Sequence, residues 1–248
     1  MGHTAQVPLQ VTSLRALLDE DPRLLHATIC EIGFNAGHSA MLWLEGTTAR
    51  VHEFDLLGLP YSQASRKLVE MLYPNRTTFH VGDSASTVRD YADRVANGTA
   101  PPCDLWSIDG DHGIHSKVDF FNALDASRAG TVVIADDAGL RFPYVRKFWR
   151  IHVGIGSIHE RACVLTHAAE NNEKTWCVGI VAPWVSALHG SGALHNRFDA
   201  AFERRREERN AAYFRARRRW PGKVGMVPFG AQRPPSSVSF SNTTRRTL

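Results

Sequence analysis

Residues 28–39 read TICEIGFNAGHS, and this stretch decides the fold. Thr28–Ile32 is a short apolar run that suits a buried strand, and Gly33 and Gly37 bracket a tight turn behind it. Glycine lets the backbone turn sharply and lets a ligand approach closely, because it carries no side chain. A helix-like segment follows, in which Ser39 can cap the helix or touch a ligand. Many such turns bind nothing, so a ligand site here needs support from the neighbouring strands.

The same alternation of apolar runs and amphipathic stretches continues as far as residue 183. Strand-like runs are Thr28–Ile32, Arg50–Asp55, Thr77–Val81, Asp104–Ile108 and Thr131–Ala135, and helix-like stretches are His38–Leu44, Ser62–Tyr73, Ser84–Val95, His115–Ala126 and Pro143–Ile151. Strands that alternate with helices of this length form parallel units, with helices covering both faces of the sheet. Two later runs, Arg161–Thr166 and Thr175–Ala182, flank the polar turn AAENNEK and predict an antiparallel hairpin. The sequence therefore predicts one three-layer α/β domain over residues 28–183, with a seven-stranded, mostly parallel sheet.

The chain outside this domain has a different composition. Residues 1–27 contain paired leucines and predict a short N-terminal docking helix. Residues 184–248 carry 13 Lys and Arg against 4 Asp and Glu, a net charge of +9, whereas residues 1–183 carry 16 against 21, a net charge of −5. Residues 184–220 predict a basic, Arg-rich helical extension, and residues 221–248, rich in Pro, Gly, Ser and Thr, predict a flexible tail. The arginines are interpreted first as a solvated helix face, and second as a site for an anion or nucleic acid.

Several classes of protein are disfavoured by composition. The cysteines are too few and too widely spaced for a disulfide-stapled scaffold, and none forms a CxxC pair: Cys30, Cys103, Cys163 and Cys177. No apolar run reaches the roughly 18 residues that a membrane span requires. The first residues, MGHTAQVPLQ, lack the basic and then apolar pattern of a secretory signal. We therefore expect a cytoplasmic protein without a membrane span.

The second and third strands end in polar residues that suit a nucleoside ligand. Asp55 lies at the carboxyl end of the second strand, where a carboxylate can accept hydrogen bonds from two ribose hydroxyls. Glu53, in the same strand, is instead expected to be solvated or ion-paired. After the third strand, Gly82, Asp83 and Ser84 form a turn of small residues that can hold a flat adenine ring. Either Asp83 or Ser84 would contact the ring edge, and Ser84 can also cap the next helix.

A cluster of carboxylates follows the fourth and fifth strands. Residues 108–112 read IDGDH and residues 135–139 read ADDAG. Since the carboxyl ends of parallel strands share one edge with the glycine turn, these carboxylates would repel one another unless a positive group lies among them. A hard divalent cation resolves this repulsion, and an all-oxygen site suits Mg²⁺, Ca²⁺ or Mn²⁺. A lone Asp at a strand end is more often a helix cap, but the whole set favours a metal: Asp109, Asp111, Asp136 and Asp137.

The chain resembles class I S-adenosylmethionine-dependent methyltransferases over roughly residues 28–182. The resemblance rests on three features in order: E-I-G-x-x-x-G-x-S, an acid at the end of the second strand, and G-D-S after the third strand. The absence of G-x-G-x-x-G argues against a dinucleotide. The resemblance implies a Rossmann-like three-layer αβα sandwich and S-adenosylmethionine as cofactor, with Glu31 at the amino-acid end of that molecule. The implied cofactor-binding residues are Glu31, Gly33, Asn35, Gly37, Ser39, Asp55, Gly82, Asp83, Ser84 and Asp109.

Through I-D-G-D-H, the carboxylate cluster is similar to the metal-dependent O-methyltransferases, including the catechol, caffeoyl-coenzyme A and macrolide-sugar types. That resemblance implies a divalent cation, expected to be Mg²⁺, on Asp109, Asp136 and Asp137. It makes His112 the general base, since a histidine with an ordinary pKa accepts a proton near neutral pH. Asp111 falls on no ligand position and would orient His112 or face the cofactor, while His115 is expected at the surface.

The function expected from these features is methyl transfer to a hydroxyl of a small molecule, such as a sugar, a vicinal diol or a phenol, with help from the metal. One alternative is an RNA methyltransferase that holds its substrate with the basic tail. The other is a non-catalytic module that binds S-adenosylmethionine. A homo-oligomer stays open, and nucleic acid is not the favoured partner.

The substrate pocket is the least defined part of this prediction. The segment after the fifth strand, Leu140–Glu160, is rich in aromatic and basic residues and is the expected pocket wall: Arg141, Phe142, Tyr144, Phe148, Trp149, His152 and His159. Such a helix is equally often core with a solvated face. Trp184 and the tail could also cover the site.

Overall fold

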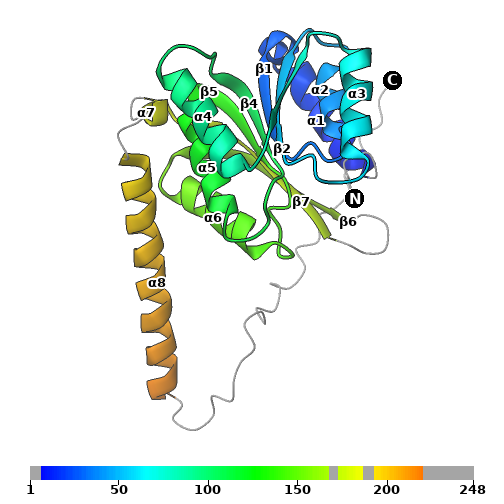
Figure 1. Ribbon diagram of the computed structural model, residues 1–248. Coiled ribbons are helices and arrows are strands. Elements are labelled where there is room, and N and C mark those ends of the chain that lie inside the picture. Colours follow the sequence, from blue (N-terminus) through cyan, green and yellow to red (C-terminus); the bar gives the residue numbers. More distant parts are fainter. Residues whose placement is uncertain (1–6, 168–172, 187–192, 220–248) are drawn as a thin grey trace, which may run out of the picture. The chain divides into compact units, whose positions relative to one another are not determined.

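The computed structural model describes residues 7–167, 173–186 and 193–219. The chain divides into two units, residues 1–202 and 203–248, and the first unit holds the α/β domain (Figure 1). The elements in chain order are α1 (Pro8–Glu20), the 3-10 helix η2 (Pro22–His26), β1 (Thr28–Ile32), α2 (His38–Leu44), β2 (Arg50–Asp55), α3 (Ser62–Leu72), β3 (Thr77–Val81), α4 (Ser84–Ala96), β4 (Cys103–Ile108), α5 (Ser116–Asp125), β5 (Ser127–Ala135), α6 (Pro143–Gly154), β6 (Ile158–His167), β7 (Glu173–Val181), α7 (Pro183–Ser186) and α8 (Ala193–Arg219).

The sheet has the predicted seven strands, in the order β3-β2-β1-β4-β5-β7-β6. Strands β1 to β5 pair in parallel, whereas β7 runs antiparallel to both β5 and β6. The first three strands have the predicted bounds, but β7 begins at Glu173 rather than Thr175. Glu173 and Lys174 belong to the strand because they pair across the hairpin with His167 and Thr166. This extension brings Lys174 into the sheet, which matters for the site described below.

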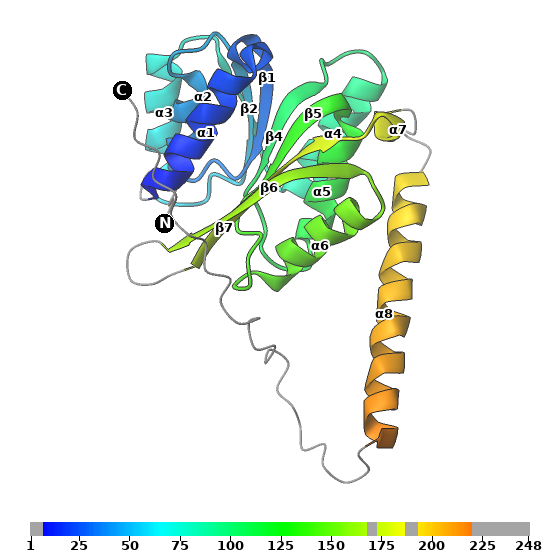
Figure 2. The same ribbon diagram turned by 180° about the vertical axis from the view of Figure 1, so that it is seen from behind.

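Two apolar cores form on the two faces of the sheet. Helices α1, α2 and α3 cover one face, and α4, α5 and α6 cover the other (Figures 1 and 2). Side chains alternate along each strand, so Ile29 packs with Trp43 of α2 while its neighbour Cys30 packs with Phe120 of α5. Burial on both faces explains why the parallel strands are short and apolar.

Helix α1 and the first part of α8 pack on the domain. Leu14 and Leu18 of α1 are buried in the core on their face of the sheet. Helix α8 begins at Ala193, within the predicted helical extension, and the Phe198 ring lies 4.7 Å from that of Phe121 in α5. None of the helices in the described ranges is long and apolar enough to cross a membrane.

The structure pairs all four cysteines, which the sequence did not predict. Cys30 of β1 is bonded to Cys103 of β4, and Cys163 of β6 is bonded to Cys177 of β7. The residues lie far apart in sequence, but each pair spans two neighbouring strands of the sheet. Disulfides are typical of oxidising compartments, whereas the sequence led us to expect a cytoplasmic protein.

Candidate functional site

The glycine turn after β1 requires both of its glycines. Gly33 has a φ of +99°, and a Cβ atom at this position would lie 2.1 Å from the carbonyl oxygen of Asp109. Gly37 has a φ of +77° and caps α2, and its Cβ would lie 2.7 Å from the ring of Phe34. The turn therefore packs directly against the end of β4, where the carboxylate cluster begins.

Asp55 lies beside this turn, at the end of β2 as predicted. Its Oδ2 accepts a hydrogen bond from the backbone N–H of Asn35 at 3.1 Å, and its Oδ1 accepts one from the N–H of Leu57 at 2.6 Å. Asn35 itself has a left-handed φ of 52°, and its side-chain oxygen accepts a bond from the hydroxyl of Tyr61 at 2.7 Å. The cofactor-binding candidates Asn35 and Asp55 are thus held together in space.

The turn after β3 contains the predicted residues in different roles. Gly82 has a φ of +145° and donates to the carbonyl of Asp55 at 3.1 Å. Asp83, not Ser84, caps α4, because its Oδ1 accepts from the N–H of Ala85 at 2.9 Å. The Ser84 hydroxyl instead donates to Asp119 Oδ1 at 2.7 Å. Burial raises the pKa of Asp119 to about 6, while the bond from Ser84 opposes this shift.

Glu31 lies on β1, two residues before Gly33, and is fully buried. Its Oε2 accepts a hydrogen bond from the Ser39 hydroxyl at 2.9 Å, and its Oε1 faces Trp43 Nε1 at 3.4 Å. Ser39 therefore contacts Glu31 rather than capping α2. Glu53 was expected to be solvated or ion-paired, and this is wrong: its side chain is buried beside Glu31, and neither oxygen has a hydrogen-bond partner among the described residues.

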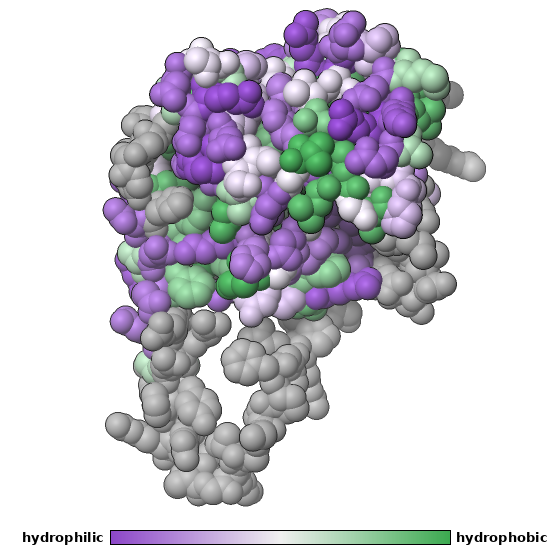
Figure 3. Space-filling view, viewed as in Figure 1, coloured by the Kyte–Doolittle hydropathy of each residue, from purple (hydrophilic) through white to green (hydrophobic). Residues whose placement is uncertain are grey.

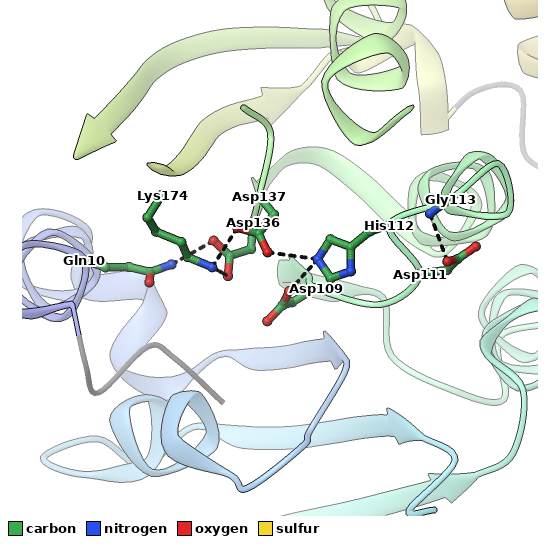
Figure 4. A network of polar contacts seen from close by, with 8 residues as sticks. All are labelled: Gln10, Asp109, Asp111, His112, Gly113, Asp136, Asp137 and Lys174. Atoms are coloured by element: carbon green, nitrogen blue, oxygen red, sulfur yellow. Dashed lines mark hydrogen bonds and ion pairs between the residues drawn. The ribbon is translucent and has the colours of Figure 1, made fainter. Parts of the chain in front are cut away.

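His112 lies between two carboxylates at the ends of β4 and β5. Its Nε2 is 2.9 Å from Asp137 Oδ2 and 3.5 Å from Asp109 Oδ1 (Figure 4). Hydrogen bonds with Asp109 and Asp137 raise the pKa of His112 to about 10, against the opposing effect of burial. Asp137 has a φ of 55°, unusual for a residue other than glycine, and such backbone strain clusters at functional sites.

Asp136 faces away from this trio, into a second group of contacts. Lys174 of β7 places its Nζ 2.6 Å from Asp136 Oδ2 and 3.0 Å from Asp137 Oδ1. Gln10 of α1 donates from Nε2 to Asp136 Oδ1 at 2.9 Å. Figure 4 shows Gln10 and Lys174 approaching Asp136 from one side, and His112 approaching Asp109 and Asp137 from the other.

Lys174 and Gln10 are the site residues that the sequence did not reveal. The repulsion within the carboxylate cluster indicated a positive group, and part of that positive charge is a lysine rather than a metal. Gln10 and Asp136 are 126 residues apart, and Lys174 falls in a stretch that looks like a polar turn. No local pattern connects either residue with the site.

The remaining predicted residues divide between the site and the core. Asp111 does not contact His112, and its Oδ1 accepts from the N–H of Gly113 at 2.9 Å on the far side of that ring (Figure 4). The Phe142 ring lies 4.3 Å from the His112 ring, so it belongs to the site. In contrast, Phe148, Trp149 and His152 lie on the buried face of α6. Trp184 donates to the carbonyl of Gly156 at 3.0 Å, next to the start of β6 and so at the opposite edge of the sheet.

The donor groups of Asp109, His112 and Asp137 are suitably arranged for a metal ion. One ligand atom from each lies within 4.8 Å of the other two. Asp136 is not part of this group of three, and its two oxygens accept hydrogen bonds from Lys174 and Gln10. Ile108, Phe120 and Val145 lie with Asp109 and His112 around a narrow gap that does not admit a water molecule.

Comparison with known proteins agrees with this architecture. Residues 30–138 match a family model described as a methyltransferase domain. The O-methyltransferase TomG from Streptomyces achromogenes, solved with S-adenosylmethionine, is 20% identical with a TM-score of 0.56, over 70% of this chain and 79% of that one. An O-methyltransferase from Bacillus cereus, solved with the demethylated cofactor, is 19% identical with a TM-score of 0.56, over 70% and 81%.

A more distant structure is described as a candidate RNA methyltransferase. This protein from Pyrococcus horikoshii is 13% identical with a TM-score of 0.51, over 70% of this chain and 82% of that one. A search of curated protein sequences gave no match. Residues 30–138 thus match a methyltransferase-domain model, and the chain shares the fold of these methyltransferase structures, as the sequence resemblance predicted.

Proposed function

We propose that the protein transfers a methyl group from S-adenosylmethionine to a hydroxyl of a small molecule, with the help of a divalent cation. The observation that carries this proposal is the contact between the glycine turn and the carboxylate cluster. Gly33 lies against the backbone of Asp109, and Asp109 shares His112 with Asp137. A cofactor held at the turn would therefore have its reactive end next to a proton acceptor.

The cation is proposed to lie on Asp109 and Asp137. A bound divalent cation would favour the ionised form of the acceptor hydroxyl and fix its position. Asp136 was expected as a third ligand, and we now propose that it supports the site through Lys174 instead. The two carboxylates offer oxygen ligands of the kind that suits the expected Mg²⁺ and also Mn²⁺.

His112 is proposed as the group that takes the proton from the acceptor. Its Nε2 faces the carboxylates and its ring lies against Phe142. The two carboxylates fix the ring orientation, and they also raise the pKa of His112 to about 10. A cation on Asp109 and Asp137 would offset that effect and lower the pKa of His112, so its role as a base depends on the proposed cation. The methyl group of a sulfonium is already activated, so the protein mainly has to supply an in-line geometry.

The acceptor is proposed to be a sugar, a vicinal diol or a phenol with an apolar portion. Loops that follow β2, β4 and β5 each expose a large apolar side chain near the carboxyl edge of the sheet: Leu56, Ile114 and Leu140. The face shown in Figure 3 is largely hydrophilic, with one apolar patch near its middle. Such side chains would favour the apolar part of an acceptor over a highly charged one.

An RNA substrate is the second candidate, because residues 184–248 carry a net charge of +9. A basic segment binds nucleic acid through phosphate contacts and does so with a strong dependence on salt. The small-molecule proposal is preferred, since the catalytic trio lies within residues 1–202 and does not need the basic segment.

The test is methyl transfer from radiolabelled S-adenosylmethionine to catechols, sugars and tRNA, each with Mg²⁺, with Mn²⁺ and with excess chelator. We expect activity on a hydroxylated small molecule, lost in chelator and in Asp109→Asn and Asp137→Asn. Asp111→Asn is the matched control and should keep its activity, because the Asp111 side chain accepts its hydrogen bond from the N–H of Gly113. Transfer to tRNA alone would support the RNA candidate, and full activity in chelator would overturn the metal proposal.

A further inference from the structure

Two buried glutamates lie side by side beneath the glycine turn. Glu31 of β1 and Glu53 of β2 are register partners on parallel strands, so their side chains project from the same face of the sheet. Their side chains are almost fully enclosed, with exposed fractions of 1% and 0%. A buried carboxylate is costly unless a hydrogen bond or an opposite charge compensates it.

The surroundings of this pair contain hydrogen-bond donors for only one of its members. Ser39 and Trp43 of α2 contact Glu31, and Ser107 of β4 also donates to it. Among the described residues no N–H or hydroxyl group donates to Glu53, and its carboxyl interacts with that of its register partner Glu31. A carboxyl that faces only another carboxyl is satisfied when a proton lies between them.

The charged groups that act on the pair are also acidic. Asp55, at the end of β2, raises the pKa of Glu53, and Asp109, at the end of β4, raises the pKa of Glu31. Burial is the larger cause in both cases, and it raises the pKa of Glu31 to about 7 and that of Glu53 well above its usual range. In the described part of the chain, no basic side chain is among the groups that act on the pair.

The cofactor would bring the missing positive charge. S-adenosylmethionine carries a sulfonium, an ammonium and a carboxylate and therefore has a net charge of +1, whereas its demethylated product has none. Glu31 lies two residues before Gly33, so the pair is directly below the turn where the cofactor is proposed to bind. An opposite charge nearby favours the ionised form of an acid.

We propose that Glu31 and Glu53 form a proton-sharing carboxyl pair that releases its proton to solvent when S-adenosylmethionine binds and takes a proton back when the demethylated product forms. Glu53 is then a positioning residue, which acts on the cofactor through Glu31. This inference rests on the proposed binding of S-adenosylmethionine. It gives the protein a means to hold the charged cofactor more tightly than the neutral product.

The test is isothermal titration of S-adenosylmethionine at pH 7 in phosphate and in Tris, which differ in ionisation enthalpy. A pair that is half-protonated at pH 7 and shifts by about one pKa unit would release about 0.4 proton per cofactor. The same shift makes binding about fivefold tighter at pH 8 than at pH 6. The demethylated product should release fewer protons and show a weaker dependence on pH.

Glu53→Gln keeps a donor toward Glu31 but has no proton to lose, so we expect the proton release and the pH dependence to disappear. Glu45→Gln is the matched control, because Glu45 is exposed at the end of α2 and pairs with Arg15. Infrared difference spectra of the wild type provide a test without any variant, since loss of the protonated carboxyl band should accompany binding. Binding without proton release, or equal release by Glu53→Gln, would overturn the inference alone. Failure to bind S-adenosylmethionine would overturn the proposed function as well.

Discussion

Replacing Lys174 with methionine would remove the cation from a buried network of charges. Its Nζ lies 2.6 Å from Asp136 and 3.0 Å from Asp137, and 9% of the side chain is exposed. At an effective dielectric constant near 20, each contact has a gross attraction of about 6 kcal/mol, and desolvation offsets most of it. The variant would leave Asp136 buried without its cation, which costs about 3–5 kcal/mol of unfolding free energy. Methionine keeps most of the length of the lysine side chain, so this loss of unfolding free energy would come mainly from the missing charge rather than from a cavity.

The assay is urea unfolding at pH 7.5, followed by far-ultraviolet circular dichroism and tryptophan fluorescence. The control is Lys117→Met, because Lys117 pairs with Asp199 at 2.8 Å and both side chains are well exposed. That pair should contribute less than about 1 kcal/mol. The double variant Asp136→Asn with Lys174→Met leaves no unpaired charge on Asp136 and should recover part of the loss. If Lys174→Met costs no more than Lys117→Met, the buried network does not stabilise the protein as argued.

Three further predictions follow from other parts of the domain. Gly33→Ala should weaken cofactor binding at least about tenfold, as measured by titration calorimetry. The left-handed backbone costs about 1–2 kcal/mol for alanine, and the new Cβ atom meets Asp109. The control for backbone strain alone is Gly98→Ala, which has a φ of +71° and open space around it and should leave binding unchanged. Replacing Cys30 and Cys103 by alanine should lower the unfolding free energy by roughly 4 kcal/mol, from a loop of 73 residues, and replacing Cys163 and Cys177 should lower it by roughly 3 kcal/mol, from a loop of 14. If a reducing agent lowers the unfolding free energy of the wild type no more than that of the variant without all four cysteines, the disulfides do not stabilise the protein as argued. Burial lowers the pKa of His52 and of His80 to about 4, so the stability they contribute is present above pH 6.5 and lost as pH falls toward 4. Between pH 7.5 and pH 5, the unfolding free energy measured in urea should fall by roughly 1–2 kcal/mol more in the wild type than in His52→Gln.

The strands could be located from sequence because their signal is local. In β1, β2 and β3, apolar runs end at polar or glycine turns, and the predicted bounds agree with the structure. The parallel pairing of β1 to β5 followed from the alternation of strands and helices, whereas the order of the strands came only from the structure. The hairpin was less well defined, because Glu173 and Lys174 look like turn residues until their pairing partners are known.

The site was predictable only to the extent that its residues follow strands. Asp109, His112 and Asp137 come directly after β4 and β5, so one edge of the sheet had to bring them together. Glu53 was misinterpreted, because the sequence does not show that Glu31 lies beside it on the next strand. The pairing of the cysteines was not predicted for the same reason, since bonds across neighbouring strands leave no spacing pattern in the chain.

The sequence by itself determined the class of fold, the turn at Gly33 and the presence of acids along one edge of the sheet. These properties depend on hydrophobic periodicity and on backbone conformation, and both are encoded within a few residues. Only the tertiary structure decided which charges compensate those acids. Lys174 and Gln10 reach Asp136 from β7 and α1, and His112 is held between Asp109 and Asp137. Electrostatic interactions act through space, so the pairing of charges depends on how distant segments pack and cannot be inferred from neighbouring residues alone.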